Sequence, residues 1–468
     1  MYSPFSKPIH ELDTKDLAIL KDLPEGWFIE YKREMIEPEK IAKSVAAFAN
    51  TDGGWLLFGI ADPERTSEDE MFPGIPKTDA PINRQQIVQA VSQHINPIPY
   101  FYTRVLDGPC SDINLKEDFS IIAIQVPYSH RTPHIQHPDG VIYQRTSDHS
   151  DPVPQTDRFK LDLLWQRGEE VTENIRQWVA HDPEFTADER DSTYFRLLLM
   201  VDPWMPIPET WIKADRTKVK EILNSSAFGD KSNFFDIVHT YLEGYLCRDF
   251  SWGQPTHYGL TFQVFRNLSC ELNVPLPILR QDYFVGSLNF EAGYAHREQY
   301  YHLLEKQNHT ASKIVDLNVV SAYIGTVVDK YLKLLKFAQV SPAFRFKAKL
   351  LNASRVVPFI DSKVVIDYFE TYGLPMIMHR DFEFPSGSGI NSFFQIEEIE
   401  NDKIADKQGT RVFIQFLRSL GIDITDHFEE LVPEFLMCLL RATGEYNRLK
   451  SFREDREDEN EDGTPTRL

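Results

Sequence analysis

The stretch that decides the fold of the first part of this chain is residues 48–60, Phe-Ala-Asn-Thr-Asp-Gly-Gly-Trp-Leu-Leu-Phe-Gly-Ile. Before it, apolar residues recur at helical spacing after Pro38, and proline is well tolerated at the first position of a helix. The paired glycines supply the helix stop, because glycine readily adopts positive φ. The apolar run that follows is typical of a buried strand. The stretch therefore predicts a helix that passes directly into a strand.

The neighbouring segments complete a mixed α/β unit covering residues 1–168. Residues 27–32 are expected to form a short strand. A second helix is expected to start at a cap on Asn83 and to end before Pro97. Three more strands are predicted at 100–106, 119–126 and 141–144. This pattern of helices and strands is plausible as one domain.

The rest of the chain is interpreted as a helix and linker (169–191), a second mixed α/β domain of unknown fold (192–450) and a charged, disordered tail (451–468). A helix is expected at 161–179. Within the aromatic-rich second region, strands are expected at 194–201, 241–250, 258–265, 283–290 and 344–350. Helices are expected there at 314–337, 409–420 and 426–440. The predicted fold class is α/β (α+β).

The composition indicates an ordinary globular protein. The chain has 468 residues, of which 42% are hydrophobic and 26% are charged. No run approaches the roughly 18 to 20 apolar residues of a membrane span, and the start lacks the apolar core of a secretory signal. The four cysteines are scattered and form no CxxC pair. Reduced thiols in a cytoplasmic protein are the expectation.

The net charge of −21 argues against a basic coat protein that binds nucleic acid over its whole surface. Nucleic-acid binding by such a chain requires that its basic residues gather in one groove. The charge alone also keeps the protein soluble.

Three acids flank the predicted strands of the first unit: Glu25, Glu30 and Asp62. Carboxylates at one sheet edge repel each other unless a cation neutralises them, and Mg²⁺ or Mn²⁺ suits such oxygen ligands. Lys32 shares a strand face with Glu30 and is a candidate phosphate contact. Two simpler interpretations remain open. Asp62 precedes a proline and can start a turn, and Glu30 with Lys32 can form an exposed pair on an edge strand.

Four sequence blocks carry a resemblance to a known family. They are Pro-Glu-Gly-Trp-Phe-Ile-Glu-Tyr-Lys (24–32), Ala-Ala-Phe-Ala-Asn-Thr-Asp-Gly-Gly (46–54), Leu-Phe-Gly-Ile-Ala-Asp (57–62), and Pro133 followed by Val-Ile-Tyr-Gln-Arg (141–145). Together they resemble the Schlafen-type AlbA domain over about residues 15–168. Some members of that family are metal-dependent endoribonucleases that cut structured RNA such as tRNA. Others are described as DNA- or RNA-binding regulators.

The resemblance implies that Glu25, Glu30 and Asp62 bind Mg²⁺ or Mn²⁺ and, with Lys32, form the catalytic site. The candidate nucleic-acid contacts are Lys32, Arg33, Lys43, Arg131 and Arg145. One departure is Ala61, which stands where the family has an acid. The chain also lacks the zinc-binding Cys and His cluster of animal Schlafens. It lacks their tandem duplication as well, and that departure implies a homodimer.

Two functions follow from this resemblance. The first is a cytoplasmic endoribonuclease acting in antiphage defence, with residues 192–450 as a sensor or dimerisation region. The alternative is a non-enzymatic DNA- or RNA-binding regulator. A scaffold with an inactive site is the third possibility.

Two other polar groupings have simpler explanations than a metal site. His130, His134, His137 and His149 crowd one segment, but the prolines among them disfavour a helix, so surface histidines are preferred. His379, Asp381 and Glu383 alternate as on a solvated strand face. Arg131, Arg145 and Arg158 are expected to line a phosphate-binding rim if the hairpin faces the acids.

Overall fold

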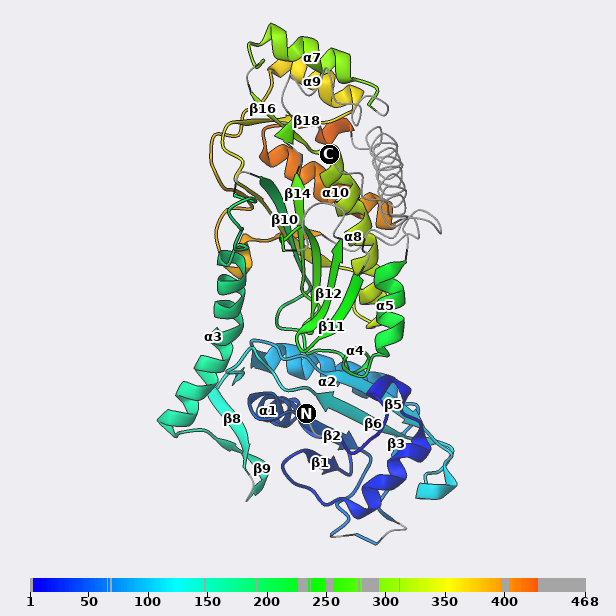
Figure 1. The fold of residues 1–468 in the computed structure, drawn as a ribbon. Helices are drawn as coiled ribbons and strands as arrows, with labels where there is room; N and C mark the ends of the chain where they lie inside the picture. Colours follow the sequence, from blue (N-terminus) through cyan, green and yellow to red (C-terminus); the bar gives the residue numbers. More distant parts are fainter. Residues whose placement is uncertain are drawn as a thin grey trace, which may run out of the picture. The chain divides into compact units, whose positions relative to one another are not determined.

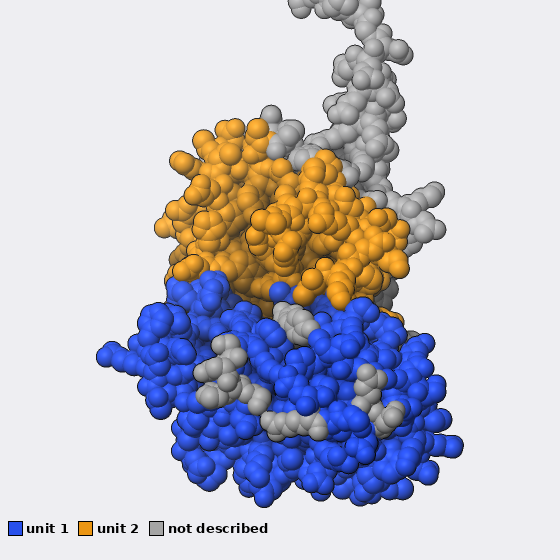
Figure 2. All heavy atoms as spheres, turned by 90° about the horizontal axis from the view of Figure 1, so that it is seen from below, with its two compact units in different colours: residues 1–175, 203–209 blue, residues 176–202, 210–468 orange. Residues whose placement is uncertain are grey.

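The computed structural model describes residues 3–64, 66–67, 70–146, 149–190, 192–225, 235, 237–249, 256–276, 278–279, 294–310, 312–396 and 404–427. Contacts between residues divide the chain into two compact units, which Figure 2 colours separately. Unit 1 contains residues 1–175 and 203–209, and unit 2 contains residues 176–202 and 210–468. The division falls inside the long helix α3 (Arg158–Ala180).

Unit 1 is built on a five-stranded mixed sheet in the order β1-β2-β6-β3, with β5 also paired to β6. Strands β1 and β2 are parallel, and the other pairs are antiparallel. Figure 1 shows α1 and α2 with this sheet. The bounds are β1 (Ile29–Lys32), β2 (Gly54–Phe58), β3 (Ile75–Pro76), β5 (Tyr102–Asp107), β6 (Phe119–Val126), α1 (Pro38–Asn50) and α2 (Ala80–His94).

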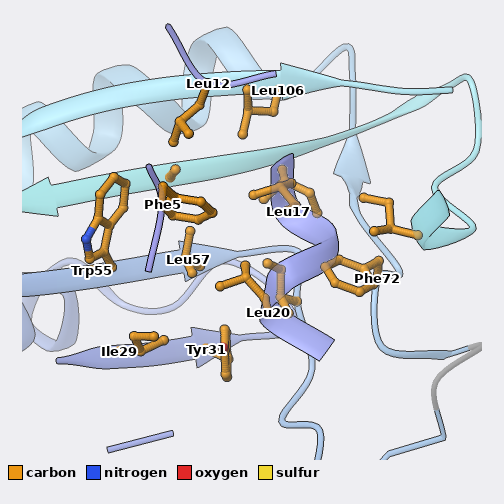
Figure 3. Close-up of a cluster of buried hydrophobic side chains, with 14 of the residues drawn as sticks. Phe5, Leu12, Leu17, Leu20, Ile29, Tyr31, Trp55, Leu57, Phe72 and Leu106 are labelled. Carbon is orange, nitrogen blue, oxygen red and sulfur yellow. The ribbon is translucent and has the colours of Figure 1, made fainter. Parts of the chain in front are cut away.

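Alternate residues of β2 enter two separate cores. Leu56 and Phe58 belong to the cluster formed with α1 and α2. Trp55 and Leu57 belong to the cluster formed with the N-terminal 3₁₀ segments η1 (Ile9–Glu11) and η2 (Thr14–Asp22). Figure 3 shows the second cluster, in which the ring of Phe5 meets Trp55 edge-on at 4.8 Å between centroids. The central strand is therefore buried on both faces, as its continuous apolar run predicted.

A smaller sheet lies against α1. It contains β4 (Ile95–Asn96), β7 (Ile135–Gln136), β8 (Val141–Thr146) and β9 (His149–Pro154). The side-chain amide of Asn50, the last residue of α1, donates hydrogen bonds to the carbonyl oxygens of His134 and Tyr143, at 2.8 and 3.0 Å. These bonds fix the hairpin to the end of α1.

Unit 2 contains an eight-stranded sheet in the order β11-β12-β13-β14-β10-β17-β19, with β20 also paired to β17, and a three-stranded sheet in the order β15-β16-β18. Helices α8 and α10 pack against each other. The strands are β10 (Thr193–Met200), β11 (Ile237–Tyr241), β12 (Gly244–Asp249), β13 (Leu260–Phe265), β14 (Cys270–Leu276), β15 (Ile278–Leu279), β16 (Lys313–Asp316), β17 (Phe344–Leu351), β18 (Val356–Phe359), β19 (Phe382–Phe384) and β20 (Phe394–Ile396). The helices are α4 (Glu209–Ile212), α5 (Arg216–Asn224), α7 (Arg297–Lys306), α8 (Asn318–Phe337), α9 (Lys363–Tyr372) and α10 (Ile404–Ser419).

Both units combine helices with sheets, which confirms the predicted α/β class. Three predicted elements differ from the structure. Helix α2 begins at Ala80 rather than after Asn83, the strand expected at 241–250 is a hairpin of β11 and β12, and the helix expected at 314–337 is β16 followed by α8. The strand expected at 283–290, most of the helix expected at 426–440, and the tail lie outside the described residues.

None of the helices in the described part of the chain is both long enough and apolar enough to cross a membrane.

Candidate functional site

Glu30 lies at the centre of a buried group of charges. Its neighbours Ile29 and Tyr31 pack into the core on the η1 and η2 side, so the alternation of β1 turns Glu30 toward α1. The carboxylate is only 3% exposed. Its Oε1 atom lies 3.0 Å from Lys32 Nζ and accepts a 2.9 Å hydrogen bond from Ser44 Oγ of α1. Its Oε2 atom lies 2.6 Å from Arg145 Nη1.

Arg145 reaches this position from β8 and has a fully buried side chain. Besides its pairing with Glu30, its Nη2 atom donates a 2.5 Å hydrogen bond to the carbonyl of Gly26. The guanidinium group lies over the ring of Phe48 at 4.6 Å from the ring centroid. Arg145 therefore connects β8, α1 and the entry to β1. Its guanidinium group is turned to these protein groups and not to the surface, where the predicted phosphate contact would require it.

Glu25 precedes β1 and is partly buried. Its Oε1 atom accepts a 2.7 Å hydrogen bond from the backbone N–H of Tyr31. Burial raises the pKa of Glu25 above its usual value, and the charges of Asp62 and Glu30 act in the same direction. The N–H of Tyr31 and the charge of Lys32 oppose this rise in pKa. The predicted acids thus lie within electrostatic reach of one another.

Asp62 follows β2 in the loop that leaves the sheet. Its Oδ1 atom accepts a 3.1 Å hydrogen bond from the N–H of Glu64, as in a turn-starting aspartate. Asp62 therefore starts a turn, as the simpler interpretation of the sequence expected.

The arrangement of these acids does not suit a divalent cation. Among the residues that the structure describes, no three His, Cys, Asp or Glu side chains are grouped closely enough to hold a metal ion. Both carboxylate oxygens of Glu30 are engaged by Lys32, Ser44 and Arg145. A cation on Glu30 would have to displace these donors. The residues as arranged do not fit a three-carboxylate metal site.

The remaining predicted basic residues keep access to the surface. Arg33 and Arg131 are exposed, and Lys32 and Lys43 are partly exposed. Lys43 Nζ lies 5.0 Å from the ring centroid of Tyr143, which orients it over β8. Because Lys32 and Ser44 meet at the same oxygen of Glu30, the end of β1 lies beside the middle of α1. Lys32, Arg33 and Lys43 are therefore brought into one part of unit 1.

The histidine grouping differs from its predicted character at His134. His134 is fully buried: its Nδ1 atom lies 2.6 Å from the carbonyl of Pro97, and its Nε2 atom lies 2.8 Å from Ser129 Oγ. Burial lowers the pKa of His134 to about 4, so the ring is neutral at pH 7. The interpretation as a surface histidine is wrong for His134 because Asn50 and the β4 loop enclose it. It holds for His137, which is exposed.

The other alternating set also lies at the surface of its own unit. His379 and Asp381 are exposed. Asp381 Oδ1 accepts from the N–H of Asn352, and Glu383 Oε1 accepts from the N–H of Gly387. These bonds are those of a solvated strand and loop. Arg158 of the proposed phosphate rim has a 94% exposed side chain that lies 3.7 Å from Asp162.

Sequence patterns did not single out Ser44 or Arg167. Ser44 was hidden in an apolar helical run, where a small hydroxyl carries no pattern. Arg167 Nη1 donates to the carbonyl of Thr51 at 3.1 Å, and its guanidinium carbon lies 4.4 Å from the ring centroid of Tyr128. An exposed tryptophan in a charged helix, Trp165, was the one available signal.

Comparison with known proteins supports the resemblance seen in the sequence. Residues 25–154 match the family model described as Schlafen, AlbA_2. Among solved structures, the chain is similar to the DIP2311 protein from Corynebacterium diphtheriae, with 20% sequence identity and a TM-score of 0.20. That similarity covers 31% of this chain and 24% of the other, so the matched part spans about a quarter of that protein. No curated protein matches the chain.

Proposed function

Because residues 25–154 match the Schlafen AlbA_2 family, we propose that unit 1 is a nucleic-acid-binding domain that contacts the phosphate backbone. The observation that carries this proposal is the joining of β1 to α1 through Glu30, which gathers Lys32, Arg33 and Lys43 from two segments. Contacts of this kind position a nucleic acid without reading its sequence.

The charge of the whole chain limits the contact to this part of the surface. A net charge of −21 repels phosphates from most of the molecule, so binding depends on a few local cations. Since Glu30 is held by protein groups, the proposal needs no metal ion. Binding should therefore persist in EDTA and weaken as salt rises.

The test is fluorescence anisotropy of the full chain with a labelled single-stranded RNA and a labelled duplex, each measured with and without EDTA. Arg33→Ala and Lys43→Ala are expected to weaken binding several-fold by removing phosphate contacts. Lys15→Ala is the matched control, because Lys15 is exposed on η2, on the opposite side of the sheet from α1. If all three variants bound RNA as tightly as the unaltered chain does, Arg33 and Lys43 would not belong to the interface.

A second candidate function is a metal-dependent endoribonuclease that acts on structured RNA such as tRNA. The observation in its favour is the raised pKa of Glu25, which burial raises most and to which the nearby charges of Asp62 and Glu30 add. Such crowding of acids is the situation that a bound cation relieves. In this function the acids would bind Mg²⁺ or Mn²⁺ after Glu30 has changed its position.

Incubation of the full chain with total tRNA and Mn²⁺ distinguishes the two candidates. Cleavage that is lost in Glu25→Gln and Asp62→Asn supports the nuclease, while these variants keep the Glu30–Arg145 pair intact. If the RNA stays intact with either metal, or if both variants cleave it as fast as the unaltered chain does, this catalytic site is rejected. Nucleic-acid binding is then the only candidate function that remains. Antiphage defence, with residues 192–450 as a sensor or dimerisation region, is proposed only together with the nuclease.

The homodimer implied by the resemblance belongs to the same proposal, since a second copy would extend the surface available to structured RNA. Light scattering of the purified chain, with and without RNA, measures its mass directly. A monomer under both conditions would end this part of the proposal.

A further inference from the structure

A hollow on unit 1 shares no lining residue with the Glu30 group. Its volume is about 350 Å³, at the lower end of the range for small-molecule sites. On one side it is lined by the ends of β4 and β7, with Asn96, Pro97, Arg131 and Ile135. On the other side it is lined by Trp165, Gly168 and Glu169 of α3.

The walls of this hollow are fixed by close packing. Trp165, Gly168 and Glu169 stand at positions i, i+3 and i+4 and therefore share one face of α3. A Cβ atom on Gly168 would lie 2.1 Å from the carbonyl oxygen of Thr132, so α3 and the Thr132 loop are in direct backbone contact. Thr132 Oγ1 also donates a 2.7 Å hydrogen bond to the carbonyl of Leu164. The hollow is thus preformed.

We propose that this hollow binds one unpaired base of a single-stranded nucleic acid. The proposal rests on the nucleic-acid-binding function of unit 1 and adds the class of ligand. Trp165 is 52% exposed although it is a large aromatic residue, and an exposed ring beside a pocket provides a surface on which a base stacks.

The polar groups at the hollow match the remaining parts of a nucleotide. The exposed guanidinium group of Arg131 is held over the ring of Trp204, 6.0 Å from its centroid, and is placed for a phosphate. The carboxylate of Glu169 can accept from a base amino group, and the amide of Asn96 can both donate and accept. A stacking surface, a cation and an acceptor within a volume this small suit a single nucleotide and exclude a double helix.

The test uses the full chain and an unstructured, mixed-sequence single-stranded RNA with a fluorescent label. Ultraviolet crosslinking followed by trypsin should place an RNA adduct on peptide 161–167, Leu-Asp-Leu-Leu-Trp-Gln-Arg, in which Trp165 is the one aromatic residue. Trp165→Ala should remove the adduct and weaken binding about tenfold, the loss typical of one stacked base. Trp165→Phe should retain most of the affinity because it keeps a ring.

Phe159→Ala is the matched control, since Phe159 is a 68% exposed aromatic residue on the same helix but does not line the hollow. It should leave adduct and affinity unchanged. RNA binding with no adduct on 161–167 and no effect of Trp165→Ala overturns the pocket and leaves the proposed function standing. No RNA binding by the full chain overturns both. Dimerisation that Trp165→Ala abolishes, with RNA affinity unchanged, assigns the hollow to a second copy of the chain and also overturns the proposal.

Discussion

Glu30 is a buried carboxylate with cationic partners on both oxygens, and this fixes what it can do. Arg145 takes one oxygen and Lys32 with Ser44 takes the other. Burying such a charge is costly, and only the complete set of partners offsets the cost. The contacts of Glu30 therefore hold β1, α1 and β8 together. Binding of a metal ion by Glu30 would compete with these contacts.

Removal of either partner should destabilise unit 1 strongly. Glu30→Gln leaves the fully buried Arg145 without its counter-charge, and breaking a buried pair in this way typically costs about 3–5 kcal/mol. Urea denaturation followed by circular dichroism measures the loss in the free energy of unfolding. The double variant Glu30→Gln with Arg145→Met should recover part of it, because the isolated charge is gone.

Arg158→Ala provides the control, since its guanidinium group is at the surface and its loss should change the free energy of unfolding by less than about 0.5 kcal/mol. If Glu30→Gln unfolded at the same urea concentration as the unaltered chain, the contacts of Glu30 would contribute nothing to the free energy of unfolding. Glu30 would then be available to a cation, and the nuclease function would gain support.

His134 predicts a sensitivity to acid. Its folded-state pKa of about 4 lies below the ordinary value of 6.5, because burial disfavours the charged ring. The neutral ring therefore stabilises the fold fully above pH 6.5, and this contribution is lost as the pH falls through about 4. The loss between pH 7 and pH 4 should be on the order of 3 kcal/mol.

Thermal unfolding as a function of pH tests this expectation. A His134→Gln variant should be less stable at pH 7, because its hydrogen bonds to Pro97 and Ser129 are altered, but its stability should fall less between pH 6.5 and pH 4. Parallel pH profiles for the two proteins would show that His134 does not titrate in this range.

At the scale of elements, the junction between α1 and β2 depends on a close approach of backbone and ring. A Cβ atom on Gly54 would lie 2.3 Å from the ring of Phe48 and 2.7 Å from the carbonyl of Phe28. The same Phe48 ring supports the guanidinium group of Arg145. The glycine therefore allows the helix, the strand and the buried pair to meet.

Gly54→Ala should lower the free energy of unfolding by about 1–3 kcal/mol through overpacking, and should shift Phe48 from beneath Arg145. The matched control is Gly26→Ala, because a Cβ atom on Gly26 meets nothing within 4 Å. Chemical denaturation of both variants gives the comparison. Equal stability would mean that the Phe48 ring moves away at no cost.

The elements predicted best were those with an uninterrupted pattern. Helix α1 follows from a 3.6-residue pattern, β17 from alternation, and β2, β6 and β10 from largely apolar runs. The helix predicted at 314–337 was wrong only at its start, where Ile314 and Val315 of β16 precede the apolar stripe of α8. The 3₁₀ segment η2 was missed because its short run carries no distinctive period.

The faces of β1 could be predicted from the sequence, but the contacts of its side chains could not. Alternation along β1 places Glu30 and Lys32 on one face and Ile29 and Tyr31 on the other. The sequence does not show that α1 and β8 cover the first of these faces. The Glu30–Arg145 bond joins residues 115 apart in the chain, and no local pattern encodes such a pair.

At the scale of the whole molecule, the decisive property is a charge of −21 on a chain with few cations at the proposed interface. The proposed interface offers Lys32, Arg33, Lys43 and Arg131 for phosphates. A strongly acidic molecule that uses so few contacts should bind weakly away from this region. Its affinity for nucleic acid should also fall less steeply with salt than the affinity of a basic nucleic-acid-binding protein does.

The salt dependence of RNA binding measures the number of these contacts. If about four phosphates of a single strand are neutralised, the logarithm of the affinity should fall with the logarithm of the salt concentration with a slope of about −3. Arg33→Ala should make the slope shallower by about 0.7, the value for one lost contact, whereas Trp165→Ala should lower the affinity without changing the slope, because stacking releases no counterions. A slope of about −6 or steeper would require a wider basic surface than unit 1 presents. In that case the contacts proposed for Lys32, Arg33, Lys43 and Arg131 would be only a minor part of the interface.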